Sequence, residues 1–216
     1  YDVEEGVGEP QPLNPQALTS GLASFSLSLR TEATGHYLLA QEEGSANGYS
    51  ANNSSTFSVV ANAPRAMIVA LANETLVSGK NIAPLGLESQ GVFVSTVGTC
   101  NSATLYVTDS YFNTVTTVSG ATITVTTPND SFDTDPGNFV IYNGSASVTN
   151  ICPRKARNVN DSLMTNAVLR AQDIDGVAPD LGCSYPSVCN SSNFTVKPGP
   201  AARLIAMDNN EAPNPG

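Results

Sequence analysis

The chain has 216 residues, of which 13% are charged and 40% hydrophobic, with 9 Lys and Arg against 19 Asp and Glu. The net charge of −10 argues against a nucleic-acid partner, because phosphate contacts need clustered basic residues. The hydrophobic content is too high for a disordered chain, and no apolar run reaches the roughly 20 residues that span a bilayer. We therefore expect a folded chain with a real core and no membrane span in this segment.

Apolar and polar residues alternate through most of the chain, which is the period of a half-buried β-strand. The clearest case is Ala23–Leu29, where Phe25, Leu27 and Leu29 fall on one face. No segment has a convincing helical stripe, although residues 161–170 fit a short helix as well as a strand edge. In chain order, the predicted strands are Ala23–Leu29, Phe57–Val60, Ala66–Leu71, Gly91–Val97, Ala103–Thr108, Ala121–Thr127, Asn138–Tyr142, Ala146–Ile151, Ala167–Ala171 and Phe194–Val196.

Turn-forming residues separate these segments. Asn-Gly occurs at 47–48 and 143–144, Ser-Gly at 78–79 and 119–120, and Asp-Pro-Gly at 135–137. Many short strands with regular turn signals predict an all-β chain that folds as a β-sandwich.

The sequence contains an internal repeat made of short blocks that recur in the same order. Ser55–Val59 returns as Ser192–Val196, and the match continues from 64–68 to 201–205. Upstream, Leu39–Glu42 corresponds to Arg170–Asp173, and Gly21–Phe25 corresponds to Gly144–Val148. The repeat predicts three units: residues 1–61 are the later half of one unit, 62–197 a complete unit, and 198–216 the opening strand of a third. The chain is then expected to belong to a longer tandem array.

Three segments resemble the immunoglobulin-like repeats of large bacterial and eukaryotic surface proteins. They are Phe194–Leu204, Val107–Val115 with its Asp-x-Tyr-x-Asn piece at Asp109 to Asn113, and Asn143–Ala146. The resemblance implies tandem immunoglobulin-like sandwiches, in which the Asp109 piece forms a corner after an early strand, as in stalks, spacers, adhesins and filaments. The four cysteines depart from the usual cysteine-free repeats. With the dense glycosylation motifs, they make the chain similar also to eukaryotic surface filaments such as flagellar hair (mastigoneme) glycoproteins.

The cysteines are Cys100, Cys152, Cys183 and Cys189, which allow three disulfide connectivities. Cys183 and Cys189 lie close together in a connection that is longer in the second copy of the repeat, so we predict a local bond there. Cys100 would then pair with Cys152. Four reduced, buried thiols are the alternative, and disulfides favour an extracellular or cell-surface location.

Acceptor motifs for N-glycosylation are frequent and point to the same location. We expect loop acceptors such as Asn73, Asn129 and Asn160 to be used before those that flank strands, whereas accidental motifs in a chain rich in Asn, Ser and Thr are the alternative. The candidates are Asn52, Asn53, Asn73, Asn129, Asn143, Asn160, Asn190 and Asn193.

The sequence offers little catalytic chemistry. His36 is the single histidine, so no Ser-His-Asp or Cys-His arrangement forms without another base, and no phosphate-binding glycine motif is present. We predict no catalytic residue, no enzyme activity and no cofactor. Paired turn carboxylates are weak calcium candidates, against a simpler reading as solvated turn residues: Asp133, Asp135, Asp173 and Asp175.

The predicted function is a non-enzymatic structural or adhesive segment of an extracellular repetitive surface or filament protein. The alternative is a carbohydrate- or ligand-binding accessory module, for which Tyr111, Phe112 and Tyr185 are the candidate stacking residues. The expected partners are neighbouring repeats or copies of the chain, joined head to tail, and surface glycans. We expect residues 202–207 to add an opening strand to the incomplete first unit.

Overall fold

The computed structural model describes residues 15–44, 48–80, 82–156, 163–176, 179, 181 and 189–201. Within them every helix or strand element is a strand, which confirms the predicted all-β class. The strands are β1 (Ala33–His36), β2 (Leu39–Ala40), β3 (Asn52–Asn53), β4 (Phe57–Val59), β5 (Ala66–Leu71), β6 (Glu74–Leu76), β7 (Leu87–Ser89), β8 (Val94–Thr96), β9 (Asn101–Thr108), β10 (Thr122–Thr126), β11 (Gly137–Val140), β12 (Ser145–Ile151), β13 (Met164–Ala167), β14 (Arg170–Asp173) and β15 (Phe194–Lys197).

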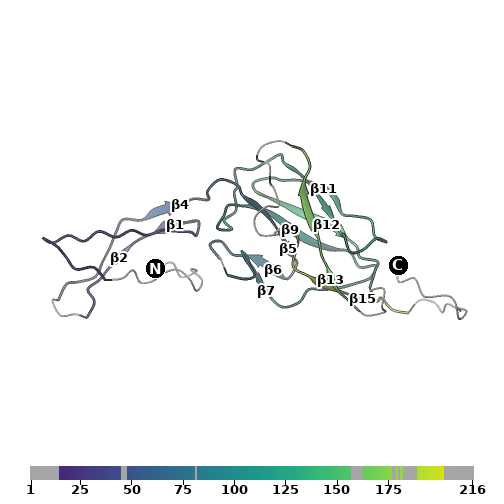
Figure 1. Ribbon diagram of the computed structural model, residues 1–216, viewed down its shortest axis with the longest axis horizontal. Helices are drawn as coiled ribbons and strands as arrows, with labels where there is room; N and C mark the ends of the chain where they lie inside the picture. Colours follow the sequence, from purple (N-terminus) through teal and green to yellow (C-terminus); the bar gives the residue numbers. More distant parts are fainter. Residues whose placement is uncertain are drawn as a thin grey trace, which may run out of the picture.

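Strands β5 to β15 form a sandwich (Figure 1). In one sheet β9 lies between β12 and β5 and runs antiparallel to both, so that Leu105 is opposite Ala146 on one side and Val69 on the other. This sheet packs against two further sheets, ordered β11-β10-β14 and β13-β15-β8, and β15 runs parallel to β8. The facing side chains form one buried core, which includes Met67, Val69, Leu105, Val107, Ile123, Val125, Ile141, Val148, Leu169, Phe194 and Val196.

Strand β5 is buried on both faces, which explains why its sequence is apolar throughout rather than alternating. Met67 and Val69 face the main core. Ile68 and Ala70 face the opposite way, into a second cluster with Leu87 and Phe112. The hairpin of β6 and β7 belongs to this second cluster and covers the outer face of the sheet.

Residues 15–44 and 48–60 form an arm, called here the N-terminal arm, that extends to one side of the sandwich (Figure 1). It contains two two-stranded sheets, β1 with β4 and β2 with β3. All strand pairings of the arm lie within it, and all those of β5 to β15 lie within the sandwich. The described part of the arm has no buried hydrophobic side chain, whereas the sandwich has a buried core beside some exposed apolar residues. The exposed large apolar side chains of the arm include Leu18, Leu22, Phe25, Tyr37, Leu38, Leu39, Tyr49 and Val60.

The arm and the sandwich contain strand pairings with the same residue register. His36 lies opposite Phe57 between β1 and β4, and Ala167 lies opposite Phe194 between β13 and β15. The aligned blocks of the sequence repeat therefore occupy corresponding positions in the two pairs. The same correspondence relates Leu39 and Asn53 to Arg170 and Asn190, and the turn bridge of Thr19 and Leu22 to that of Tyr142 and Ser145.

A side-chain hydrogen bond is reproduced at corresponding positions as well. Ser54 Oγ accepts the N–H of Leu38 at 2.9 Å, and Ser191 Oγ accepts the N–H of Leu169 at 3.0 Å. Each serine hydroxyl also donates to the carbonyl of the next residue. The correspondence between arm and sandwich thus extends from strand pairing to individual polar contacts.

One predicted strand is wrong. Ala23–Leu29 alternates clearly, yet the structure places no strand there. The corresponding segment of the sandwich is β12, which pairs with β9. Alternation creates an apolar face, but a strand also needs a neighbour for its backbone hydrogen bonds, and the described part of the arm supplies none beside residues 23–29.

Other differences are smaller, and one is that strands β1, β2 and β3 of the arm were not predicted. The predicted strand Ala167–Ala171 is interrupted, because β13 ends at Ala167 and β14 begins at Arg170. The β6–β7 hairpin was not predicted. Of the predicted third unit, residues 198–216, the structure describes only 198–201, and residues 202–207 lie outside the described part.

Candidate functional site

The corner after β9 is built around the buried carboxylate of Asp109, which is 1% exposed. Asp109 Oδ1 accepts the backbone N–H groups of Tyr111 at 2.8 Å and Asn113 at 3.0 Å. Asp109 Oδ2 accepts the N–H of Asn62 and the side-chain amide of Asn113, both at 2.9 Å. Four donors therefore surround one carboxylate, and one of them comes from the connection between the arm and β5.

Asn113 extends this network into the arm. Its Oδ1 accepts the backbone N–H of Glu32 at 2.8 Å, and its Nδ2 donates to the carbonyl of Arg30 at 2.7 Å as well as to Asp109. Asn113 is 2% exposed, so these bonds are shielded from water. The side chain thus bonds to the arm backbone on both sides of Thr31.

The same stretch of the arm makes two further contacts with the sandwich. Thr31 is buried against Gly79, where an added Cβ would overlap the Thr31 side chain. Gly79 has a φ of +79° and donates its N–H to the carbonyl of Tyr111 at 2.7 Å. The guanidinium carbon of Arg30 lies 5.4 Å from the centre of the Tyr111 ring, within cation–π range.

We call this set the junction: Arg30, Thr31, Glu32, Asn62, Gly79, Asp109, Tyr111 and Asn113. Both Asp109 oxygens accept hydrogen bonds from the protein, so the carboxylate holds the corner and the connecting segment together. The sequence placed Asp109 and Asn113 at a corner, and the structure does so too. The sequence did not indicate which residues of the arm bond to Asn113.

The calcium candidates already accept hydrogen bonds from N–H and O–H groups of the protein; Asp173 ends β14, and the others lie between strands. Asp133 Oδ2 accepts the hydroxyl of Thr127 at 2.6 Å, and Asp135 Oδ1 accepts the N–H of Thr127 at 2.8 Å. Asp173 accepts the N–H groups of Asp175 and Leu181, and Asp175 accepts that of Thr122. Across the described residues, the structure brings no three His, Cys, Asp or Glu side chains into a metal-binding group.

The carboxyl of Asp133 is partly buried and lies near Thr127, Asp130, Asp135 and Arg154. Burial raises the pKa of its carboxyl above the ordinary value. The hydrogen bond from Thr127 and the charge of Arg154 lower this pKa, whereas the charges of Asp130 and Asp135 raise it further. The net direction is upward, because removal of the charged form from water outweighs the single hydrogen bond.

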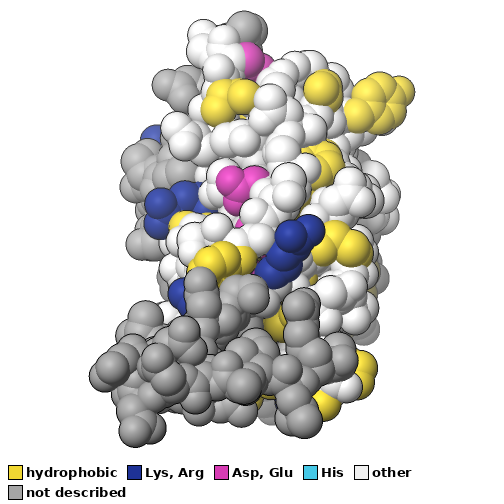
Figure 2. Space-filling model, turned by 90° about the vertical axis from the view of Figure 1, so that its right-hand side faces the viewer, with side chains coloured by type: hydrophobic (Ala, Val, Ile, Leu, Met, Phe, Trp, Pro, Cys, Tyr) yellow, Lys and Arg dark blue, Asp and Glu magenta, His cyan; other side chains and the backbone are white. Residues whose placement is uncertain are grey.

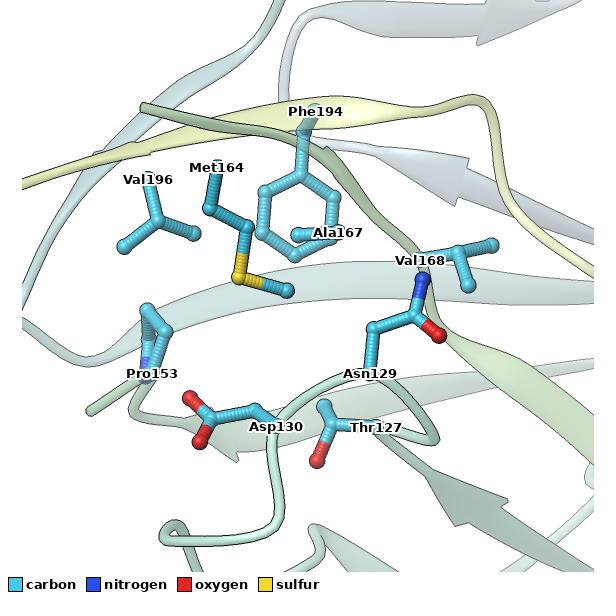
Figure 3. A pocket seen from close by; sticks show the side chains of 9 residues that line it. All are labelled: Thr127, Asn129, Asp130, Pro153, Met164, Ala167, Val168, Phe194 and Val196. Atoms are coloured by element: carbon cyan, nitrogen blue, oxygen red, sulfur yellow. The ribbon is translucent and has the colours of Figure 1, made fainter. Parts of the chain in front are cut away.

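Another acidic residue, Asp130, lines a small cavity near the end of the sandwich (Figure 3). Its Oδ2 accepts the N–H groups of Arg154 and Lys155 at 2.7 and 2.8 Å. The opposite wall is apolar and includes Met164, Phe194 and Val196. The cavity has a volume of about 10 Å³, which is room for no more than one water molecule, so it is not a substrate pocket.

The Cys100–Cys152 disulfide is confirmed, and it joins the residue before β9 to the residue after β12. Asn101 and Ile151, its chain neighbours, are already paired between these strands. Cys189 is buried and disulfide-bonded. Its predicted partner, Cys183, lies outside the described residues.

The glycosylation candidates differ in how their side chains are engaged. Asn73 Nδ2 donates to Ser89 Oγ and to a backbone carbonyl, and Asn129 Nδ2 donates to the carbonyl of Asn166 at 2.6 Å. Asn160 lies outside the described residues. The remaining candidates are exposed: Asn52, Asn53, Asn143, Asn190 and Asn193.

His36 and the described candidates for sugar stacking have structural contacts. His36 stacks on Phe57 with ring centres 5.9 Å apart, and its Nε2 lies 3.3 Å from the Thr31 carbonyl. Phe112 is buried in the second cluster, whereas Tyr111 contacts Arg30. Tyr185 lies outside the described residues.

Comparison with known proteins gives no assignment: no protein-family model matches the chain, and neither does any curated protein. Among the residues that the structure describes, no helix has the length and apolar character to cross a membrane.

Proposed function

We propose that this chain is a non-enzymatic structural segment of an extracellular protein built from tandem immunoglobulin-like units, such as a stalk, fibre, adhesin or other surface filament. The observation that supports this most directly is the junction. A load-transmitting array needs successive units to keep a fixed relative orientation, and the junction bonds one β unit to the next through buried polar groups.

The chemistry of the junction suits this role. Apolar contacts are non-directional, whereas hydrogen bonds fix both distance and angle. Asn113 bonds to the arm backbone at Arg30 and Glu32, and Asp109 bonds to the connecting segment at Asn62. Rotation of the arm would break several buried bonds together, which is costly because the groups would be left without water or protein partners.

Other features support the extracellular and tandem parts of the proposal. The Cys100–Cys152 bond favours an oxidising compartment, and several glycosylation candidates are exposed. The shared register of the β1–β4 and β13–β15 pairs is what two copies of one repeating unit would produce. Figure 2 shows one end of the sandwich, whose described part has scattered charged and hydrophobic side chains among other side chains and backbone.

A carbohydrate-binding module is the weaker candidate. Sugar-binding platforms present exposed aromatic rings, whereas the ring of Phe112 is buried and that of Tyr111, which is 37% exposed, lies against Arg30 at the junction. In the described fold, Tyr111 and Phe112 thus make contacts that stabilise the structure.

Immunogold labelling tests the proposal. An antibody against this chain is expected to label the outside of intact, unpermeabilised cells that make the protein, and the purified native protein is expected to appear as a beaded rod in negatively stained micrographs. Antibody preabsorbed with the chain is the control. Label that appears only after permeabilisation would contradict the proposal.

A further inference from the structure

Three exposed apolar residues of the N-terminal arm, Leu18, Phe25 and Leu38, correspond to buried core residues of the sandwich. Phe25 is 52% exposed, whereas its counterpart Val148 is 0% exposed. Leu38 is 42% exposed, whereas its counterpart Leu169 is 0% exposed. The described part of the arm therefore exposes side chains that would form one half of a hydrophobic core, and the side chains that would cover them are not present in it. A further pair shows the same contrast: Leu18 with Ile141.

The sandwich shows which strands cover these positions. β9 pairs with β12 and covers the region of Val148, β10 pairs with β14, and β8 runs parallel to β15. In the described part of the arm, the counterparts of β14 and β15 are β2 and β4, and each lies in a sheet of only two strands. The described part of the arm thus has no strand at the positions where the sandwich has β8 and β10, and none beside residues 22–28 where the sandwich has β9.

We propose that the apolar face of the N-terminal arm is a docking surface for a β segment patterned like residues 62–137, which would supply counterparts of β5, β8, β9 and β10 and close the arm into a second sandwich. This inference deepens the proposed function, on which it rests, because it states what one unit of the array must receive from its neighbour. The apolar face of the arm is suited to bind an incomplete apolar β-sheet with free edges, and it is not suited to bind a small molecule.

A second copy of the chain does not fit this surface. In such a copy the inner face of β9 is already covered, since Leu105 and Val107 are fully buried in its own core. To dock on the arm of its partner, β9 would have to leave β12 and β5. The occupant is therefore a segment that resembles residues 62–137 but does not carry, in its own fold, the later strands that cover β9 in the sandwich.

An opening strand alone is also insufficient. The counterpart of residues 203–208 in the sandwich is β5, and the sheet order β12-β9-β5 places β9 between β5 and β12. A β5-like strand added to the arm would lack this intermediate strand. Residues 22–28, the counterpart of β12, would remain without a neighbour, so the donated strand predicted from the sequence needs a β9-like strand with it.

The test is to insert a second copy of residues 62–137 between Asn14 and Pro15 of the full chain, which places it in the register of the sandwich. Hydrogen exchange of the segment 22–28, measured by mass spectrometry, is expected to slow by about tenfold or more, and the fluorescence of a hydrophobic dye to fall. The matched control carries Leu105→Asp and Val125→Asp in the inserted copy only, and should show neither change.

Exchange of the segment 145–151 reports whether the original sandwich stays folded in each variant. If it does, and residues 22–28 exchange as fast as in the unmodified chain, the proposal is overturned. Concentration-dependent protection of residues 22–28 in the unmodified chain, with a dimer in sedimentation, would also overturn it in favour of a second copy. The labelling experiment is independent, since an intracellular location would reject the proposed function without altering the exchange result.

Discussion

Asn113 Oδ1 accepts the backbone N–H of Glu32 at 2.8 Å, although 81 residues separate the two in sequence. Glu32 lies in the N-terminal arm and Asn113 in the corner after β9, so this bond joins the two parts of the molecule. The same side chain donates to Arg30 and to Asp109. One amide thus satisfies groups on both sides of the junction.

The first prediction concerns this amide. Asn113→Ala removes the acceptor of the Glu32 N–H, a donor to the Arg30 carbonyl and one of the two donors to Asp109 Oδ2, so the free energy of unfolding should fall by about 2–3 kcal/mol. Urea denaturation measures this change, and small-angle scattering should show a wider range of arm positions. Asn193→Ala, at an exposed asparagine, is the control and should change neither. Equal effects of the two substitutions would show that the junction does not orient the arm.

The second prediction separates backbone strain from contact between the arm and the sandwich. Gly79 and Gly120 both have positive φ, but an added Cβ at Gly79 overlaps Thr31, whereas one at Gly120 meets nothing within 4 Å. Gly79→Ala should therefore destabilise the chain by about 1–3 kcal/mol more than Gly120→Ala. Thr31→Ala should recover part of this difference, measured by denaturation of the four variants as a double-mutant cycle. Additivity of Gly79→Ala and Thr31→Ala would argue against a tight contact.

Local sequence patterns were sufficient to predict β5 and the turn before β12. The bounds of β5, Ala66–Leu71, agree with the prediction because its residues are uniformly apolar and β-favouring. The Asn143-Gly144 turn also follows from sequence, since both residues have the positive φ that this dipeptide tolerates.

Features that depend on distant partners were not predictable in this way. β6 and β7 are three residues each, and their packing over Ile68 and Ala70 has no periodic signature. Ala23–Leu29 has the signature but no strand, because the neighbour that β12 finds in β9 is missing beside it. The junction was not predicted either, because its partners are distant in sequence. The Asp-x-Tyr-x-Asn piece indicates a corner, but nothing in it identifies Arg30 and Glu32 as its partners.

The third prediction concerns the confirmed disulfide. Cys100 and Cys152 are separated by 52 residues, and a cross-link closing a loop of that length restricts the unfolded chain by about 4 kcal/mol in the chain-entropy model. The double variant Cys100→Ala/Cys152→Ala should lose about this amount, measured by urea denaturation without reductant. Reductant added to the variant should have a further effect, because Cys189 is also disulfide-bonded. A loss below about 1 kcal/mol would mean that the unfolded state is already compact near this loop.

The fourth prediction ranks the glycosylation candidates by the state of their amide nitrogen. Asn129 Nδ2 donates to the Asn166 carbonyl, and Asn73 Nδ2 is bonded within its loop, whereas Asn53 and Asn193 are exposed. Glycopeptide mass spectrometry on material from a glycosylating host should find higher occupancy at Asn53 and Asn193. This order differs from the loop-first expectation based on sequence. Full occupancy at Asn129 with an unmodified Asn53 would favour the earlier order.

The last prediction follows from the raised pKa of Asp133. Between the ordinary value of 3.8 and the higher pKa of the folded state, the folded chain binds more protons at this site than the unfolded chain. The contribution of Asp133 to the free energy of unfolding therefore decreases as the pH rises through that interval.

Asp133→Asn keeps an oxygen for the Thr127 hydroxyl, avoids burial of a charge and removes repulsion with Asp130 and Asp135. The variant should gain stability relative to the parent on going from pH 4 to pH 7, as measured by urea denaturation at both values. Glu88→Gln, which removes an exposed carboxylate, controls for the change in net charge. A difference between Asp133→Asn and the parent that stays constant with pH, or that grows toward pH 4 in favour of the variant, would show that burial of Asp133 does not govern its ionisation.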